Sequence, residues 1–195
     1  CISFANGQIS PVGKVDSDPD RGSALPDGMA DALKQMAINN NTYYATCPAN
    51  PSGDIVWVEQ GDCSYQGNLS VNGSSKKGVF ILNRGTLQLA GGVQWYGLIY
   101  ALNAQGCGTA SPSGSCINAG NGNSDGVVDI TGTVTIRGGV FVEGAGRLST
   151  GNSGGNGNCA NCNPNLVYDP SAGLNITAHG TAGIIQNTWR ELLPD

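Results

Sequence analysis

The sequence contains little charge and only one histidine. Of its 195 residues, 9 are Lys or Arg and 14 are Asp or Glu, so that 12% are charged and the formal net charge is −5. Soluble domains usually carry ~25% charged residues. So few cations, adjacent only at Lys76 and Lys77, argue against binding to a nucleic-acid backbone. The single histidine, His179, argues against a nucleophilic hydrolase that uses a Ser-His-Asp arrangement.

The chain also lacks any apolar run of ~18 residues, so no membrane span is predicted. Glycine, in contrast, is abundant, with 31 residues, which is about double its usual share. Because each interior glycine weakens a helix by ~1 kcal/mol, a long helical bundle is excluded. The length suits one domain, which leaves a repetitive β-structure or partial disorder.

Six of the seven cysteines form pairs that are close in the sequence. These pairs are Cys47 with Cys63, Cys107 with Cys116, and Cys159 with Cys162. They predict disulfides that close short loops in an oxidising compartment, although the sequence leaves the connectivity open. A zinc site is disfavoured because no second Cys-x-x-Cys accompanies Cys159-Ala-Asn-Cys162. The remaining Cys1 can pair with another chain, stay free or carry a lipid.

One helix is predicted near the N-terminus. Asp27 is a candidate N-cap, and apolar residues recur at helical spacing at Met29, Ala32, Leu33, Met36 and Ala37. We therefore expect residues 1–53 to form an N-terminal extension with a helix that caps one end of a core. Residues 54–195 are expected to form the main domain, in one structural unit with this extension.

From residue 54 the apolar residues recur with a period of two, which predicts strands at 54–59, 79–82 and 93–102. A repeat follows: Gly85-Thr-Leu-Gln-Leu-Ala-Gly-Gly-Val93 resembles residues 132–140, and a shorter copy starts at Gly67. Short aliphatic strands between glycine corners are typical of stacked β-solenoid coils. The predicted fold class is therefore all-β, a right-handed β-helix-like solenoid with one short helix. Loop insertions at 103–124 and 149–165 would be closed by disulfides, and a β-sandwich with Gly-rich hairpins is the alternative.

Two acidic loops resemble calcium sites. Asn121, Asn123, Asp125 and Asp129 provide oxygen ligands at positions 1, 3, 5 and 9 of an EF-hand-like loop, with glycine at position 6. The bidentate glutamate at position 12 is missing, so the predicted site is weak. Residues 16–27 also alternate carboxylates. Ordinary turns and a helix cap are the favoured explanation of both patterns.

No catalytic residues are predicted. Between residue 85 and Asp169 the only acidic residues are Asp125, Asp129 and Glu143, which do not suggest a glycosidase pair. A weak ligand-binding prediction rests on Trp95 and Tyr96, which point to opposite faces of a strand. One of these two rings would stack on a sugar, whereas both would pack in the core if the protein binds none.

Several short motifs resemble the C-terminal region of PilX-type pilus assembly proteins. These motifs are Gly78-Val-Phe-Ile-Leu82, the repeat at 85–93, Trp95-Tyr-Gly-Leu-Ile-Tyr100, Tyr168-Asp-Pro170 and Thr188-Trp-Arg-Glu191. The resemblance covers roughly residues 27–195. It implies an exported β-helix-like module attached to a type IV pilus or a related filament, with no catalytic residues. Such proteins begin with a hydrophobic pilin-type helix, whereas this chain begins at Cys1.

The sequence thus predicts a non-enzymatic, extracellular structural or adhesive module of a pilus or surface filament. Its partners would be other filament subunits or further copies of itself, with no nucleic acid and no membrane span. No cofactor is expected apart from the weak calcium site. A carbohydrate- or surface-binding module is the alternative, and a β-helix enzyme acting on polysaccharide comes third.

Overall fold

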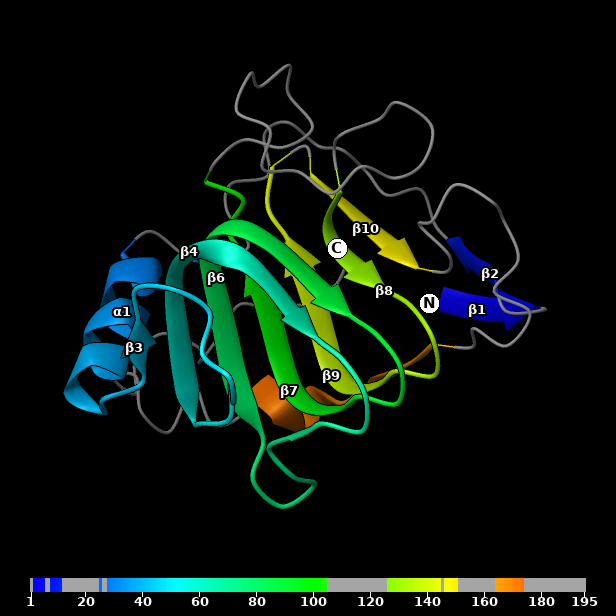
Figure 1. The fold of residues 1–195 in the computed structure, drawn as a ribbon, viewed down its shortest axis with the longest axis horizontal. Coiled ribbons are helices and arrows are strands. Elements are labelled where there is room, and N and C mark those ends of the chain that lie inside the picture. Colours follow the sequence, from blue (N-terminus) through cyan, green and yellow to red (C-terminus); the bar gives the residue numbers. More distant parts are fainter. Residues whose placement is uncertain are drawn as a thin grey trace, which may run out of the picture.

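Parallel β-strands, flanked by one short helix, make up most of the described chain (Figure 1). The structure is a computed structural model, and it describes residues 2–5, 8–11, 25, 28–104, 126–144, 146–150 and 164–173. In these residues β1 (Ile2–Ala5) and β2 (Gln8–Pro11) form a two-stranded antiparallel sheet. All later strands belong to one nine-stranded sheet. The all-β prediction is confirmed.

The nine strands pair in three parallel series. They are β3 (Tyr43–Tyr44), β4 (Ile55–Tyr65), β5 (Ser70–Val71), β6 (Gly78–Leu89), β7 (Gln94–Ala101), β8 (Gly126–Ile130), β9 (Thr135–Val142), β10 (Arg147–Thr150) and β11 (Asn165–Tyr168). The first series joins β3, β4, β6, β7 and β9. The second joins the later parts of β4 and β6 to β8 and β10, and the third joins β5, β7, β9 and β11.

This pairing does not fit the β-sandwich alternative, because hairpins pair their strands antiparallel. The sheet is open: its order runs from β10 to β11 without returning on itself. The finer prediction of a solenoid therefore stays a prediction.

The strand register differs from the predicted repeat. Leu87 pairs with Val128, and Trp95 pairs with Ile136. The glycine at 132 accordingly stacks on Gly91, whose nitrogen would lie 2.7 Å from a Cβ added at Gly132. The predicted alignment of residues 132–140 with 85–93 is wrong, because the similar sequence at 126–130 occupies the place beside β6.

The boundaries of the second predicted insertion also change. Ser149 and Thr150 belong to β10, and Asn165 begins β11. Most of both predicted insertions lies outside the described residues.

Apolar side chains fill both faces of the first series of strands. One cluster of buried side chains is shared by all three series and includes Phe80, Leu87 and Trp95. A second cluster lies on the other face of β4, β6 and β7, and Trp57 and Ile81 belong to it. Strands buried on both faces are typical of parallel pairing with a covering layer outside.

The helix α1 (Met29–Asn39) covers part of the second cluster. Its buried residues Leu33 and Ala37 pack with Ile55 and Trp57 of β4. It lies beside β3 and β4 at one end of the sheet (Figure 1). The helix prediction is confirmed, but the N-cap is Gly28, without a side-chain cap, and the predicted cap Asp27 lies outside the described residues.

Close approach between paired strands explains part of the glycine excess. A Cβ added at Gly97 would lie 2.0 Å from the carbonyl oxygen of Gly78, and one added at Gly138 would lie 1.9 Å from that of Gly97. These three residues face one another in neighbouring strands. A side chain at Gly97 or Gly138 would therefore collide with the backbone of the strand before it.

Candidate functional site

A disulfide joins the segment after β3 to the first long strand. Cys47 and Cys63 are bonded with a Cα–Cα distance of 5.4 Å, which confirms the first predicted pair. Cys63 is only 1% exposed and belongs to the main core. The remaining cysteines, at positions 1, 107, 116, 159 and 162, lie outside the described residues.

Residues 42–53, which we call the edge cover, follow the side of β4 that faces away from β6. Strand β3 within it pairs with β4. The Tyr65 hydroxyl donates a hydrogen bond to the Pro48 carbonyl over 3.0 Å. The backbone N–H of Asn72 donates one to Ser52 Oγ over 3.1 Å. Together with the disulfide, these contacts cover the outer edge of β4 and hold the residue that follows β5.

A cluster around Glu59 fixes α1 to the sheet. Its carboxylate accepts hydrogen bonds from Trp57 Nε1 at 3.1 Å and Asn83 Nδ2 at 2.8 Å, and Lys34 Nζ lies 2.8 Å away. The hydrogen bond from Lys34, with those from Trp57 and Asn83, lowers the pKa of Glu59 to about 2. Lys34 Nζ also lies 5.6 Å from the centre of the Tyr43 ring. A carboxylate held ionised in this way anchors the helix and cannot donate a proton near neutral pH.

A second ion pair fixes the turn after β11. Lys77 Nζ lies 2.7 Å from Asp169 Oδ2, and the Ser171 hydroxyl donates to Asp169 Oδ1 over 2.6 Å. The hydrogen bond from Lys77 lowers the pKa of Asp169 to about 2. The short 3₁₀ helix η1 (Pro170–Gly173) is thereby held against the sheet, where Ala172 is buried.

Only one of the predicted calcium ligands is described. Asp129 lies in the middle of β8, opposite Gln88, and is 6% exposed. The other three, Asn121, Asn123 and Asp125, lie outside the described residues, as do the four aspartates of the stretch at 16–27. Within the described part, no three His, Cys, Asp or Glu residues gather as metal ligands.

The structure separates the two predicted sugar-binding rings. Trp95 is 1% exposed and packs edge-on against Phe80, with ring centroids 5.4 Å apart. Trp95 therefore offers no face to a sugar, which leaves Tyr96 as the ring to which the prediction applies. Tyr96 lies on the opposite face, is partly exposed and stands beside Arg137 of β9.

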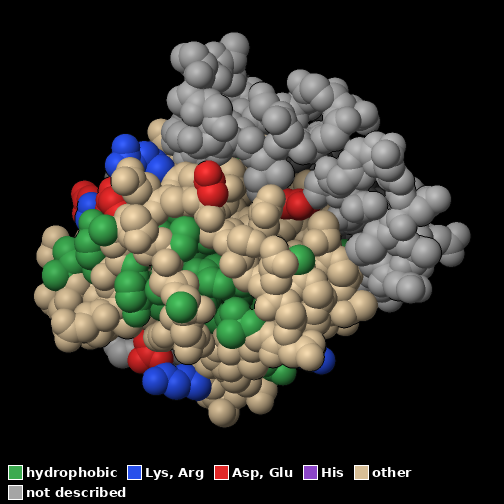
Figure 2. Space-filling view, viewed as in Figure 1, with side chains coloured by type: hydrophobic (Ala, Val, Ile, Leu, Met, Phe, Trp, Pro, Cys, Tyr) green, Lys and Arg blue, Asp and Glu red, His purple; other side chains and the backbone are tan. Residues whose placement is uncertain are grey.

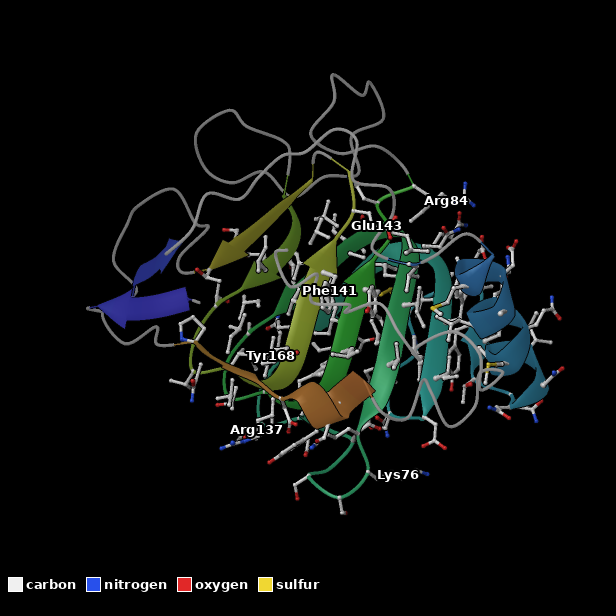
Figure 3. All side chains as sticks on the ribbon, turned by 180° about the vertical axis from the view of Figure 1, so that it is seen from behind. Lys76, Arg84, Arg137, Phe141, Glu143 and Tyr168 are labelled. Atoms are coloured by element: carbon white, nitrogen blue, oxygen red, sulfur yellow. A yellow bond between two sulfur atoms is a disulfide. The ribbon has the colours of Figure 1, made fainter. Side chains whose placement is uncertain are left out.

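Two exposed aromatic residues were not predicted as site residues. Phe141 is 36% exposed and stacks on Tyr100 with ring centroids 4.7 Å apart, and Tyr168 is 77% exposed. Figure 3 shows Phe141 on β9 and Tyr168 on the neighbouring β11. The opposite side of the molecule, in Figure 2, is mostly polar side chains and backbone with scattered apolar side chains. Phe141 could have been found from the alternation along β9, because it lies two residues after Gly139 and four after Arg137 on the same strand face.

The described residues bring no acid–base pair or nucleophile together in a recognisable catalytic arrangement. The chain matches no protein-family profile, no curated protein and no solved structure. In the described part, no helix is long and apolar enough to cross a membrane. Strand edges and exposed aromatic rings are therefore the features of the described residues that bear on function.

Proposed function

We propose that the three parallel series are the sides of a β-solenoid. Along the chain, successive strand segments lie in the first, second and third series in turn: the first part of β6 lies in the first series, its later part in the second, and the start of β7 in the third. Support comes from the paired glycines at positions 78, 97 and 138, which recur where the third series passes into the first. Stacked coils bury a continuous aliphatic column that no single coil could bury alone.

On this fold, we propose that the chain is an extracellular structural or adhesive module of a pilus or related surface filament. The observation that carries the proposal is the buried disulfide that ties the edge cover to β4. Disulfides persist in oxidising compartments, and a covered sheet edge suits a protein exposed at high local concentration. The motifs that resemble those of PilX-type proteins suggest the same class, and its partners would be filament subunits.

Fractionation of source cells tests this proposal. Surface material sheared from the cells should contain the chain, and non-reduced peptide mapping should find Cys47 linked to Cys63. The control is a cytoplasmic marker protein, which should be absent from the sheared fraction. Recovery of the chain in the cytoplasm, with both thiols alkylated after denaturation, would overturn the proposal.

A carbohydrate-binding module is the second candidate, and Tyr96 is the observation that favours it. Its partly exposed ring stands beside Arg137, so that a sugar could stack on one and hydrogen-bond to the other. A glycan array of wild type and Tyr96→Ala tests this candidate, with Ile38→Ala on α1 as a control for the loss of an exposed apolar side chain. Binding that is lost only in Tyr96→Ala would support it, and an array without binding by the wild type would exclude it for the glycans present.

A further inference from the structure

The two outer edges of the first series of strands differ. At β4 the edge cover lies along the outer side of the strand. At the other end, β9 pairs with β7 along its whole length, but it pairs with β11 only as far as Gly138. Among the described residues, no strand lies along the outer side of Gly139–Val142.

The direction of the backbone groups at this open edge follows from two hydrogen bonds. The Glu143 amide donates to the Ala101 carbonyl of β7, whereas the Gly138 carbonyl accepts from Asp169 on the other side. Successive residues of a strand point their N–H and C=O groups to alternate sides. The backbone groups of Val140 and Val142 therefore point away from β7, toward the open edge.

The side chains at this edge are apolar. Val140 and Val142 are only partly buried, although both pack against the main core. Phe141, on the other face, is one of the few large hydrophobic side chains exposed in the described part. An uncharged strand edge of this kind readily pairs with another strand.

We propose that this edge pairs with the same edge of a second copy of the chain, antiparallel and with a two-fold axis at Phe141. Val140 then faces Val142 of the second copy, and the reverse pair forms by symmetry. Both residues point their backbone groups outward, so the two pairs form four N–H···O=C hydrogen bonds. Phe141 meets the second copy's Phe141 on the outer face, where each ring covers the other.

The charges beside the edge fit this arrangement. Arg137 and Glu143 flank the apolar segment with opposite signs and lie on the same strand face as Phe141 (Figure 3). In the proposed register Glu143 of the second copy faces Gly139, and it lies diagonally from Arg137. Opposite charges in such diagonal positions attract.

The edge cover at β4 explains why pairing would stop at two copies. Head-to-tail stacking through the first series needs an open edge at both of its ends, whereas the edge cover occupies the β4 end. A two-fold contact uses the β9 edge of both copies, so this edge is not available to a third copy. This dimer does not depend on the proposed filament or carbohydrate function.

Light scattering coupled to size exclusion tests the proposal with two matched variants. Phe141→Lys places two like charges opposite each other at the axis, and Tyr168→Lys makes the same change of net charge on β11. We expect the wild type and Tyr168→Lys to show twice the chain mass and to dissociate on dilution. Phe141→Lys should dimerise at least about tenfold more weakly. A monomeric wild type at every concentration, or a Phe141→Lys dimer as stable as the wild type, would overturn the proposal.

Cysteine cross-linking tests the register itself. Cα atoms of a directly facing pair that shares no hydrogen bonds lie about 4.5 Å apart, within disulfide range. Phe141→Cys should therefore give a covalent dimer on mild oxidation, beyond any formed by the wild type. Arg137→Cys is the control, because its two copies would lie about 25 Å apart. Equal cross-linking of both variants, or none in Phe141→Cys, would contradict the two-fold axis at residue 141.

Discussion

Removal of the Cys47–Cys63 disulfide should strongly destabilise the fold. The bond closes a loop with a sequence separation of 16 residues. Loop-closure entropy for that length predicts a loss of about 3 kcal/mol in the free energy of unfolding. Replacement of the buried Cys63 by alanine adds up to about 1 kcal/mol for lost packing. The double variant Cys47→Ala/Cys63→Ala should therefore lose about 3–4 kcal/mol.

Urea unfolding at neutral pH, followed by tryptophan fluorescence, measures this loss. The two single variants serve as matched controls, because either one breaks the bond. If the cross-link carries the effect, each single variant should cost nearly as much as the double variant, so that their effects do not add. A double variant within about 1 kcal/mol of the wild type would refute the reasoning, as would single effects that add up to the double effect.

Two further predictions concern an ion pair and a strand contact. The pKa of Glu59 is lowered from 4.5 to about 2, so its stabilisation is complete above pH 4.5 and is lost as the pH falls toward 2. Glu59→Gln, which weakens the contact with Lys34, should cost about 1 kcal/mol at pH 7 after allowance for solvent screening. A chemical-denaturation series should show this difference vanish near pH 2, and a constant difference would contradict the assignment. Gly97→Ala should cost more than about 3 kcal/mol, because its Cβ would collide with the Gly78 carbonyl, whereas Gly67→Ala should cost about 1 kcal/mol for its positive φ alone. Thermal unfolding compares the two, and equal losses would show that the close contact does not matter.

The glycine-bounded aliphatic segments predicted the β-class, and local spacing predicted the Cys47–Cys63 pair. Both are short-range properties. Alternation along a strand defines its two faces within a few residues, and cysteines close in sequence meet with little loss of entropy. The helix was predicted for the same reason, because its apolar spacing at Leu33 and Ala37 is local.

The interior position of Trp95 could not be read from the sequence. Alternation correctly placed Trp95 and Tyr96 on opposite faces of β7. However, β7 is largely buried, with apolar residues on both faces, so its pattern does not say which face is the core. The face of β7 that is buried is determined by the contacts of Trp95 with Phe80 and Tyr65 from other strands.

The sequence by itself determined the strand-forming segments, the helix and one disulfide of this protein. The tertiary structure decided the register, which depends on pairing between segments as far apart as Leu87 and Val128. It also decided which strand edge is covered and which has no strand beside it among the described residues. A strand edge is open when no other strand pairs with it. The local sequence of β9 does not show whether another strand pairs there.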